Sequence, residues 1–204
     1  MSRRQRPSDD GLAVRDRLLE AGARLFSERG YAATSVGAIC EQAGVGKPAL
    51  YWHFDSKEGL LAAVLESLSS RRIDAVRKHA AGASAGRRLG QMVEGMRRLV
   101  LEEPHLLRLP TLAAMEQGAE SPAVRRAVID IWDRSGEALV RDMEAATGRD
   151  VDELEEVAFV ALGLLSAASV RFSIDGDVQR LDRSLSAMER AVRALLADPP
   201  EDES

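Results

Sequence analysis

Apolar residues recur along this chain three or four positions apart, which is the spacing of one face of an α-helix. A stripe of this kind covers residues 14–25 and stops before Gly30, a residue suited to the end of a helix. The sequence holds no sustained alternation of apolar and polar residues, which is the signature of a half-buried strand. The pattern therefore predicts an all-α fold.

Two short helices are predicted next, on either side of the turn Gly44-Val45-Gly46. Ser35 is a suitable N-cap for the first of them, and Leu50 and Phe54 mark the inward face of the second. Such a layout is a helix-turn-helix, whose second helix can enter the major groove of DNA. Cap residues predict where three later helices begin: Asp55 with Glu58, Ser121 before Pro122, and Asp150 with Glu153.

The outer face of the second short helix carries the candidate chemistry. With Leu50 inward and 100° per residue, Pro48 and Trp52 lie almost opposite the core. A tryptophan exposed beside a proline is unfavourable in water without a partner, so this face is predicted to bind something. The flanking and edge positions of the same face are Ala49, Tyr51, Lys47 and His53.

Charge is distributed unevenly along the chain. The formal net charge of −5, taken alone, argues against nucleic acid as a partner. Residues 1–80, however, hold 13 Lys and Arg against 10 Asp and Glu, whereas residues 81–204 hold 15 against 23. Only the first part therefore favours a polyanion.

Other features of the sequence exclude whole classes of site. Cys40 is the only cysteine of the 204 residues and the three histidines are far apart, so we expect no disulfide, no zinc site and no cofactor. The longest uncharged run in the apolar second half, Val157–Val170, is 14 residues long, too short to suggest a membrane span. No apolar segment of a secretory signal follows the basic start. We expect a cytoplasmic protein without a membrane partner.

An ordered series of short stretches runs through the first part of the chain: Ala23-Arg24-Leu25-Phe26, Gly30-Tyr31, Thr34-Ser35-Val36, Ala43-Gly44-Val45, Leu50-Tyr51-Trp52-His53-Phe54 and Ser56-Lys57-Glu58. In this series the chain resembles the tetracycline-repressor (TetR) family of bacterial transcription regulators. The resemblance implies two sets of DNA contacts. Phosphates would be contacted by Thr34, Ser35, Tyr51 and Lys57, and bases or grooves by Lys47, Pro48, Ala49, Trp52 and His53. Gly46 departs from the serine that the family often has, which removes one hydroxyl from the turn.

Beyond about residue 65 the resemblance implies only an all-helical effector and dimerisation domain. The expected organisation is a flexible basic tail at 1–10, a helix-turn-helix domain at 11–57, a linking helix at 56–80, a ligand-binding and dimerisation domain at 81–198, and an acidic tail at 199–204. The expected function is that of a homodimeric repressor. A small apolar effector molecule would release it from palindromic double-stranded operator DNA.

Candidate residues for the two roles of the second domain share large apolar side chains. The effector cavity is expected to be lined by Met92, Met96, Leu112, Met115, Trp132 and Phe172, each of which could equally be ordinary core. The dimer interface is expected on a stripe of the last helix, Leu181, Leu185, Met188, Val192 and Leu195, buried partly against a second subunit. The run Val157–Val170 would complete half of a four-helix bundle with that subunit, or else form an intrachain core helix.

Two other functions stay open at this point. A DNA-binding regulator without a small-molecule effector would have a packed second domain with no enclosed cavity. An enzyme that uses the helical domain has little support, because the sequence holds no glycine-rich phosphate loop and no zinc-binding helix motif. His105 is a lone histidine beside a proline. We therefore predict a protein that is not an enzyme.

Overall fold

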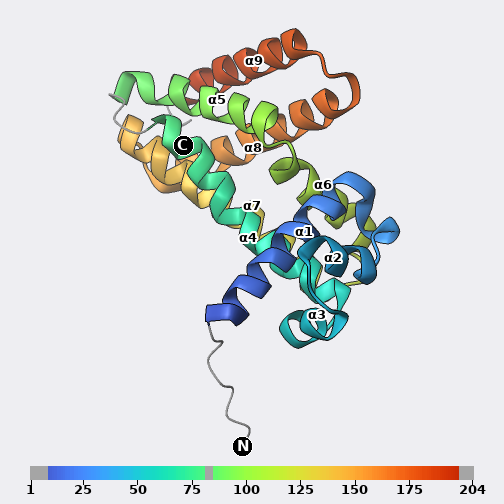
Figure 1. Ribbon diagram of the computed structural model, residues 1–204. Helices are drawn as coiled ribbons and strands as arrows, with labels where there is room; N and C mark the ends of the chain where they lie inside the picture. Colours follow the sequence, from blue (N-terminus) through green and yellow to red (C-terminus); the bar gives the residue numbers. More distant parts are fainter. Residues whose placement is uncertain (1–8, 81–84, 198–204) are drawn as a thin grey trace, which may run out of the picture. The chain divides into compact units, whose positions relative to one another are not determined.

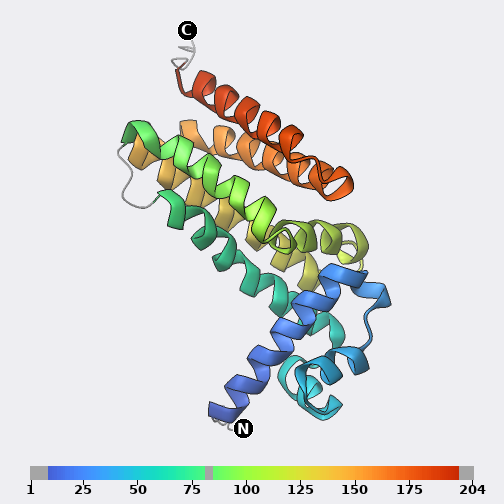
Figure 2. The same cartoon turned by 45° about the horizontal axis from the view of Figure 1, so that its top comes forward.

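The computed structural model describes residues 9–80 and 85–197, and every regular element in these ranges is a helix (Figures 1 and 2). The predicted all-α fold is confirmed. Of the predicted tails, residues 1–8 and 199–204 lie outside the described residues, and Asp9 already belongs to the first helix. The helices are α1 (Asp9–Ala33), α2 (Val36–Ala43), α3 (Lys47–Phe54), α4 (Lys57–Ala80), α5 (Ala85–Glu102), α6 (His105–Gln117), α7 (Pro122–Thr147), α8 (Val151–Asp175) and α9 (Val178–Ala197).

The described helices form two compact units. Unit 1 contains α1 to α3, α4 through Ser67, and residues 109–129 from α6 and the start of α7; unit 2 contains residues 68–108 and the chain from Asp130 onward. The units therefore divide the chain inside α4, α6 and α7. Apolar periodicity shows that α6 has a buried face, but it carries no information about which unit buries that face.

The core of unit 1 is formed where α1 packs against α2 and α3. Large side chains from all three helices are fully buried there, namely Leu18, Leu25, Phe26, Ile39 and Leu50. Gly30 breaks the regular path of α1 with a φ of 78° and a ψ of 167°, a conformation that glycine adopts without steric cost. The predicted helix end at Gly30 is confirmed as a break, after which helical structure resumes as far as Ala33.

Several predicted helix ends are confirmed by their hydrogen bonds. The Ser35 hydroxyl oxygen accepts from the Ala38 N–H at 3.1 Å, and Gly44 ends α2 in the left-handed conformation with a φ of 65°. Ser121 accepts from the Val124 N–H at 3.1 Å to cap α7, and Asp150 accepts from the Asp152 N–H at 3.1 Å to cap α8.

The predicted start of α4 is wrong by one residue. Ser56 caps this helix, because its hydroxyl oxygen accepts from the Gly59 N–H at 2.9 Å. Asp55 instead ends α3, with a φ of 62° and its N–H bonded to the Tyr51 carbonyl at 3.0 Å. Glu58 does not complete a capping pair; its carboxylate accepts a hydrogen bond from the Ser121 hydroxyl within unit 1. The signal for the correct cap was the serine itself, whose hydroxyl competes well for an N-cap position.

In unit 2, α8 and α9 run side by side as an antiparallel pair, and α5 packs against α9 (Figure 2). One further approach is unusually close. A Cβ atom on Gly95 of α5 would lie 2.7 Å from the carbonyl oxygen of Val76 and 3.0 Å from its Cα. Only glycine allows these two helices to touch at the level of their backbones.

Candidate nucleic-acid interface

The segment from α2 to α3 has the geometry of a helix-turn-helix. Gly44 turns the chain after α2, and the next residue, Val45, donates its N–H to the Cys40 carbonyl at 3.0 Å. Ile39 on α2 and Leu50 and Phe54 on α3 are buried, so the two short helices share one apolar interior with α1. α3 is thus held from behind, and its opposite face is left to the solvent.

That outer face carries the residues that the helical geometry placed there. Trp52 is 66% exposed and Tyr51 is 47% exposed, and Lys47 and Pro48 are exposed beside them. Ala49 and His53 are half-buried at the edges. The predicted orientation of α3 is confirmed, and it produces a surface of aromatic and apolar groups with one lysine at its N-terminal end.

The aromatic rings on α3 are supported by their neighbours. The rings of Trp52 and His53 meet edge to face, with centroids 4.5 Å apart. The Arg15 guanidinium of α1 lies 5.4 Å from the centre of the Phe54 ring. Burial lowers the pKa of His53 below its ordinary value, and the nearby Arg15 charge lowers that pKa further. His53 is therefore neutral at physiological pH, when it can accept or donate a hydrogen bond without adding charge.

Ser35 remains suited to a phosphate contact. It is exposed, and its hydroxyl oxygen accepts the capping bond from Ala38, so the hydroxyl hydrogen is still available to donate. As the N-cap of α2 it also lies where the backbone N–H groups of a helix favour an anion.

Thr34 is not suited to the phosphate contact that the resemblance implied. Its side chain is buried, and its hydroxyl lies 3.1 Å from the Leu25 carbonyl and 2.7 Å from the Gly30 carbonyl, to which it donates. The hydroxyl therefore stabilises the end of α1, and its burial keeps it from a phosphate at the surface. A single sequence cannot distinguish these roles, because both favour a threonine directly before an exposed N-cap.

Lys57 is also engaged inside unit 1. Its ammonium group donates to the carbonyls of Tyr31 at 2.8 Å and Thr34 at 2.9 Å, and it lies 4.0 Å from the centre of the Tyr31 ring. Burial lowers the pKa of this lysine. The lysine thus stabilises the connection between α1 and α2 with two of its three N–H donors, and its predicted phosphate contact stays a prediction.

The six candidate ligand residues are distributed over both units, and the four in unit 2 do not line one pocket. Met92 and Met96 line one cavity of unit 2, whereas Trp132 lines a different hollow of about 520 Å³ between α7 and α8. Phe172 is half-buried and lines neither space, and Leu112 and Met115 belong to unit 1. Met115 is 81% exposed, so its prediction as a buried lining residue is wrong. The spacing of apolar residues does not show that Met115 lies on the exposed face of α6.

Most residues of the predicted dimer stripe are buried within the chain itself. Leu181, Leu185, Met188 and Val192 are buried where α9 packs on α8 and α5, so they cannot meet a second subunit. Leu195 alone of the five is exposed. The stripe was correctly predicted to be buried, but a pattern on one helix does not tell which partner covers it.

The outer face of α8 is the large apolar surface of unit 2. Phe159 is 73% exposed, and the other large apolar residues of this face are Val160, Leu164, Val170 and Ile174. Among the described helices, α8 is also the one long and apolar enough to cross a membrane by length and composition, although 33% of its most apolar window is buried in the protein. An exposed apolar patch of this kind marks an interaction surface.

Arg72 is a residue that the sequence interpretation missed. It lines the cavity that holds Met92 and Met96, and its side chain is almost fully buried. A signal was present in the sequence, because Leu61, Leu65, Leu68 and Arg72 follow one another at the spacing of a single helical face. An arginine at the fourth position of an inward stripe indicates a buried charge.

Comparison with known proteins links the first part of the chain to regulators. Residues 18–64 match the family model of bacterial regulatory proteins of the tetR family. The transcriptional regulator TtgR of Pseudomonas putida is 41% identical over 64 residues, which are 31% of this chain and 30% of TtgR. The transcriptional repressor KstR2 of Rhodococcus jostii is 47% identical over 62 residues, which are 29% of this chain and 30% of KstR2. The matches thus span less than a third of these relatives.

Solved structures resemble nearly the whole chain. A TetR transcriptional regulator from Legionella pneumophila has a TM-score of 0.72 at 18% identity and covers 86% of this chain and 95% of its own. GusR of Salmonella enterica has a TM-score of 0.69 at 22% identity, covering 91% and 96%. These likenesses extend the shared fold into unit 2. The match over residues 18–64, which contain the helix-turn-helix of α2 and α3, relates this part of the chain to the tetR family of bacterial regulatory proteins, and the solved structures show that the fold of the chain is similar to theirs.

Proposed function

We propose that this protein is a homodimeric transcriptional repressor that binds double-stranded operator DNA in the cytoplasm and leaves it when a small molecule binds in unit 2. The observation that carries the DNA-binding step is the outer face of α3, where Trp52 is 66% exposed on a helix held from behind by α1 and α2. A rigid helix with an exposed, chemically mixed face fits the major groove.

The contacts divide by chemistry. Pro48, Ala49 and Trp52 offer apolar surface that suits thymine methyl groups and base edges, whereas His53 can hydrogen-bond a base. Phosphate contacts fall to Lys47, Tyr51 and Ser35, which lie at the edges of the surface or at the N-terminus of α2. The side chain of Thr34 has no part in this set because it is buried and bonded within unit 1.

The DNA-binding proposal is tested by selection. A pool of random double-stranded sequences is enriched on the full-length protein, and the recovered sequence is expected to be a palindrome with half-sites about 34 Å apart. Trp52→Ala should lower the preference for that sequence over random DNA by about 1–3 kcal/mol per half-site and leave the salt dependence unchanged. Met115→Ala, which truncates an exposed apolar residue of unit 1 away from α3, is the matched control. Equal losses on both DNAs would contradict the proposed role of Trp52.

A homodimer is favoured by the two-fold demand of such an operator and by the exposed face of α8. The occupant we propose for that face is α8 of a second copy, with the outward side of α9 and Leu195 alongside, because a two-fold axis lets identical apolar faces cover each other. Phe159→Asp should therefore convert the dimer to a monomer in sedimentation and weaken operator binding. Ile129→Asp, a charge placed on an exposed apolar residue of α7, should leave the dimer intact. A dimer that survives Phe159→Asp would place the interface elsewhere.

Effector binding is supported by the cavity of unit 2 that holds Met92 and Met96 and by the continuity of α4. This helix supplies residues to both units, Lys57–Ser67 to unit 1 and the remainder to unit 2. A ligand that shifts the unit 2 part of α4 would act on the helix that follows α3 directly. A coupling of about 1–3 kcal/mol, which is usual for such systems, would release operator DNA roughly 5–150-fold.

A further inference from the structure

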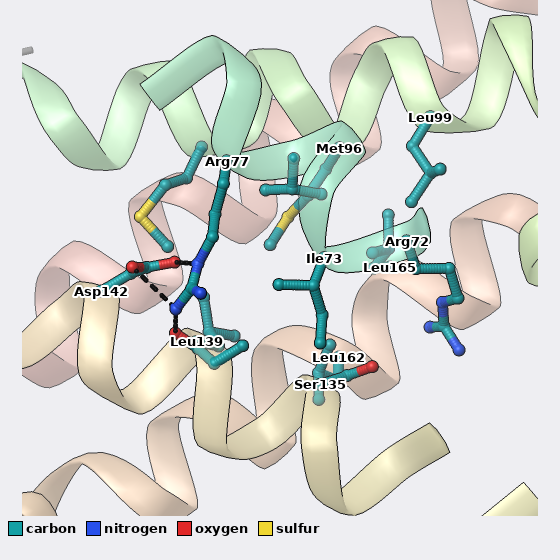
Figure 3. A pocket seen from close by; sticks show the side chains of 13 residues that line it. Arg72, Ile73, Arg77, Met96, Leu99, Ser135, Leu139, Asp142, Leu162 and Leu165 are labelled. Carbon is teal, nitrogen blue, oxygen red and sulfur yellow. Dashed lines mark hydrogen bonds and ion pairs between the residues drawn. The ribbon is translucent and has the colours of Figure 1, made fainter. Parts of the chain in front are cut away.

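The cavity that holds Met92 and Met96 is built from four helices of unit 2, namely α4, α5, α7 and α8. Its volume is about 40 Å³, which is room for a few water molecules, and it is partly open to the surface. Most of its wall is apolar, from residues such as Ile73, Leu99, Leu139 and Leu165 (Figure 3). Three charged side chains also line it, and only two of them, Arg77 and Asp142, form an ion pair.

Arg77 and Asp142 satisfy each other. The Arg77 guanidinium donates to both carboxylate oxygens of Asp142, at 3.0 and 3.2 Å, and to the Ala138 carbonyl at 3.4 Å. Figure 3 shows these bonds on one side of the pocket. The two charges cancel, so this pair attracts neither an anion nor a cation strongly.

Arg72 is the third charge. It lies on the other side of the view in Figure 3, and its side chain is only 7% exposed. Its Nε is buried and has no hydrogen-bond partner in the part of the chain that the structure describes. Burial lowers the pKa of this guanidinium to about 10, which still leaves it charged at neutral pH. The cavity wall therefore carries one uncompensated positive charge.

A second buried polar group on α4 also lacks a hydrogen-bond partner among the described residues. This group is the Ser69 hydroxyl, one turn before Arg72. Two such groups on one face of α4 are unfavourable, because a buried polar group without a partner costs free energy and a buried charge costs more. An anion with hydrogen-bond acceptors would satisfy the arginine, and apolar atoms would not.

From this arrangement we infer that the effector is a small organic anion, a carboxylate with a short apolar chain. Its head group would pair with Arg72 and its chain would lie among Met92, Met96, Leu99 and Leu165. This inference rests on the proposed function, because it names the class of ligand for the same effector site. The empty cavity is smaller than such a molecule, so binding must widen it. The flexible methionine side chains suit that adjustment.

The test compares two probes of equal length on the full-length protein without DNA. Titration calorimetry measures the affinity for octanoate and for 1-octanol, which lacks the charge. Wild-type protein is expected to prefer octanoate at least about tenfold, the effect of a single charge-assisted hydrogen bond. Arg72→Met should abolish that preference, and Arg72→Lys should restore part of it.

Arg71→Met is the matched control, because Arg71 is the neighbouring arginine of α4 and its exposed side chain pairs with Glu103. It should keep the preference for octanoate. Equal affinity of wild-type protein for the two probes, failure to bind octanoate at millimolar concentration, or an undiminished preference in Arg72→Met would each overturn the inference. Binding of the selected operator DNA, measured on the same samples by fluorescence anisotropy, reports on the proposed function independently of these outcomes.

Discussion

Lys57 in unit 1 and Arg72 in unit 2 are both basic residues of α4 with a pKa lowered by burial, but Lys57 is partly buried and Arg72 almost fully buried, and their surroundings differ. Lys57 donates to two carbonyl oxygens and lies over the Tyr31 ring. Arg72 lines a mostly apolar cavity, and its buried Nε has no hydrogen-bond partner among the residues that the structure describes. The protein itself supplies hydrogen-bond acceptors to the lysine, whereas the described residues supply none to the Nε of the arginine.

Under the proposed function, this difference matches the two roles of the units, DNA binding in unit 1 and effector binding in unit 2. In unit 1 Thr34 and Lys57 are hydrogen-bonded to carbonyls of the protein itself, so these two side chains support the elements that precede α3. In unit 2 the Arg72 Nε has no partner among the described residues, and the proposed anionic ligand would gain binding free energy there that can shift the conformation. The same class of side chain is structural in one unit and available for binding in the other.

The largest expected effect is that of Lys57→Met. This change leaves the carbonyls of Tyr31 and Thr34 without their charged donor, and hydrogen bonds to charged groups contribute about 1.5–3 kcal/mol each. We expect a loss of roughly 2–4 kcal/mol in the free energy of unfolding, measured by urea denaturation. Lys78→Met, at an exposed lysine of the same helix, is the control. A stable Lys57→Met protein with a reduced salt dependence of DNA binding would show that Lys57 contacts phosphate after all.

Arg72→Met is expected to act in the opposite direction. Replacing an unpaired buried charge by an apolar side chain of similar length should raise the free energy of unfolding of the ligand-free protein by about 1–3 kcal/mol. The advantage of Arg72→Met over wild type should shrink as the pH rises above about 10, because the wild-type arginine then loses its proton and no longer has a buried charge that destabilises the folded state. If Arg72→Met unfolds more readily than wild type at neutral pH, the arginine has a structural partner and the contrast with Lys57 fails.

A smaller effect is expected from Lys47→Ala on the outer face of α3. Lys47 is exposed, so its loss should leave the melting temperature unchanged. If it neutralises a phosphate, the slope of log affinity against log salt should fall by about 1 per contact, or about 2 per dimer. Comparing this slope with that of Lys57→Met separates a lysine that binds DNA from one that stabilises the domain.

The smallest effect concerns pH. Burial and then the Arg15 charge lower the pKa of His53 in the folded protein, so the unfolded chain binds more protons once the pH falls through the ordinary value near 6.5. The stability contributed by neutral His53 is therefore present above that value and is lost progressively below it. His53→Gln should flatten the fall in stability between about pH 7 and pH 5.5, followed by urea denaturation. An unchanged pH dependence would show that His53 is freely solvated.

Local signals in the sequence predicted the local structure well. The caps Ser35, Gly44, Ser121 and Asp150 each act within a few residues of their own position, so their effect can be inferred without knowing the rest of the fold. The orientation of Trp52 follows from Leu50 two positions earlier, again within one helix. These inferences depend only on helical geometry.

Inferences that needed a second element were less successful. The hydroxyl of Thr34, which lies between α1 and α2, donates to carbonyls of α1, and the ammonium of Lys57 in α4 donates to the carbonyls of Tyr31 and Thr34. The sequence around each residue fits a phosphate contact equally well. The stripe of α9 is apolar for the reason predicted, but α5 and α8 cover it. Met115 is apolar and exposed, and residue type alone does not reveal such an exception.

The backbone contact between α4 and α5 at Gly95 has a consequence for how this protein could diversify. Any side chain at position 95 would meet the Val76 carbonyl and push the two helices apart. Because those helices carry Arg72 on one side of the cavity and Met92 and Met96 on the other, the exchange of one glycine codon would enlarge the space and leave the charge in place. If the cavity is the proposed effector site, the length of the ligand and the sign of its charge are set at different positions of the chain, and a substitution at Gly95 would alter the first without changing the second.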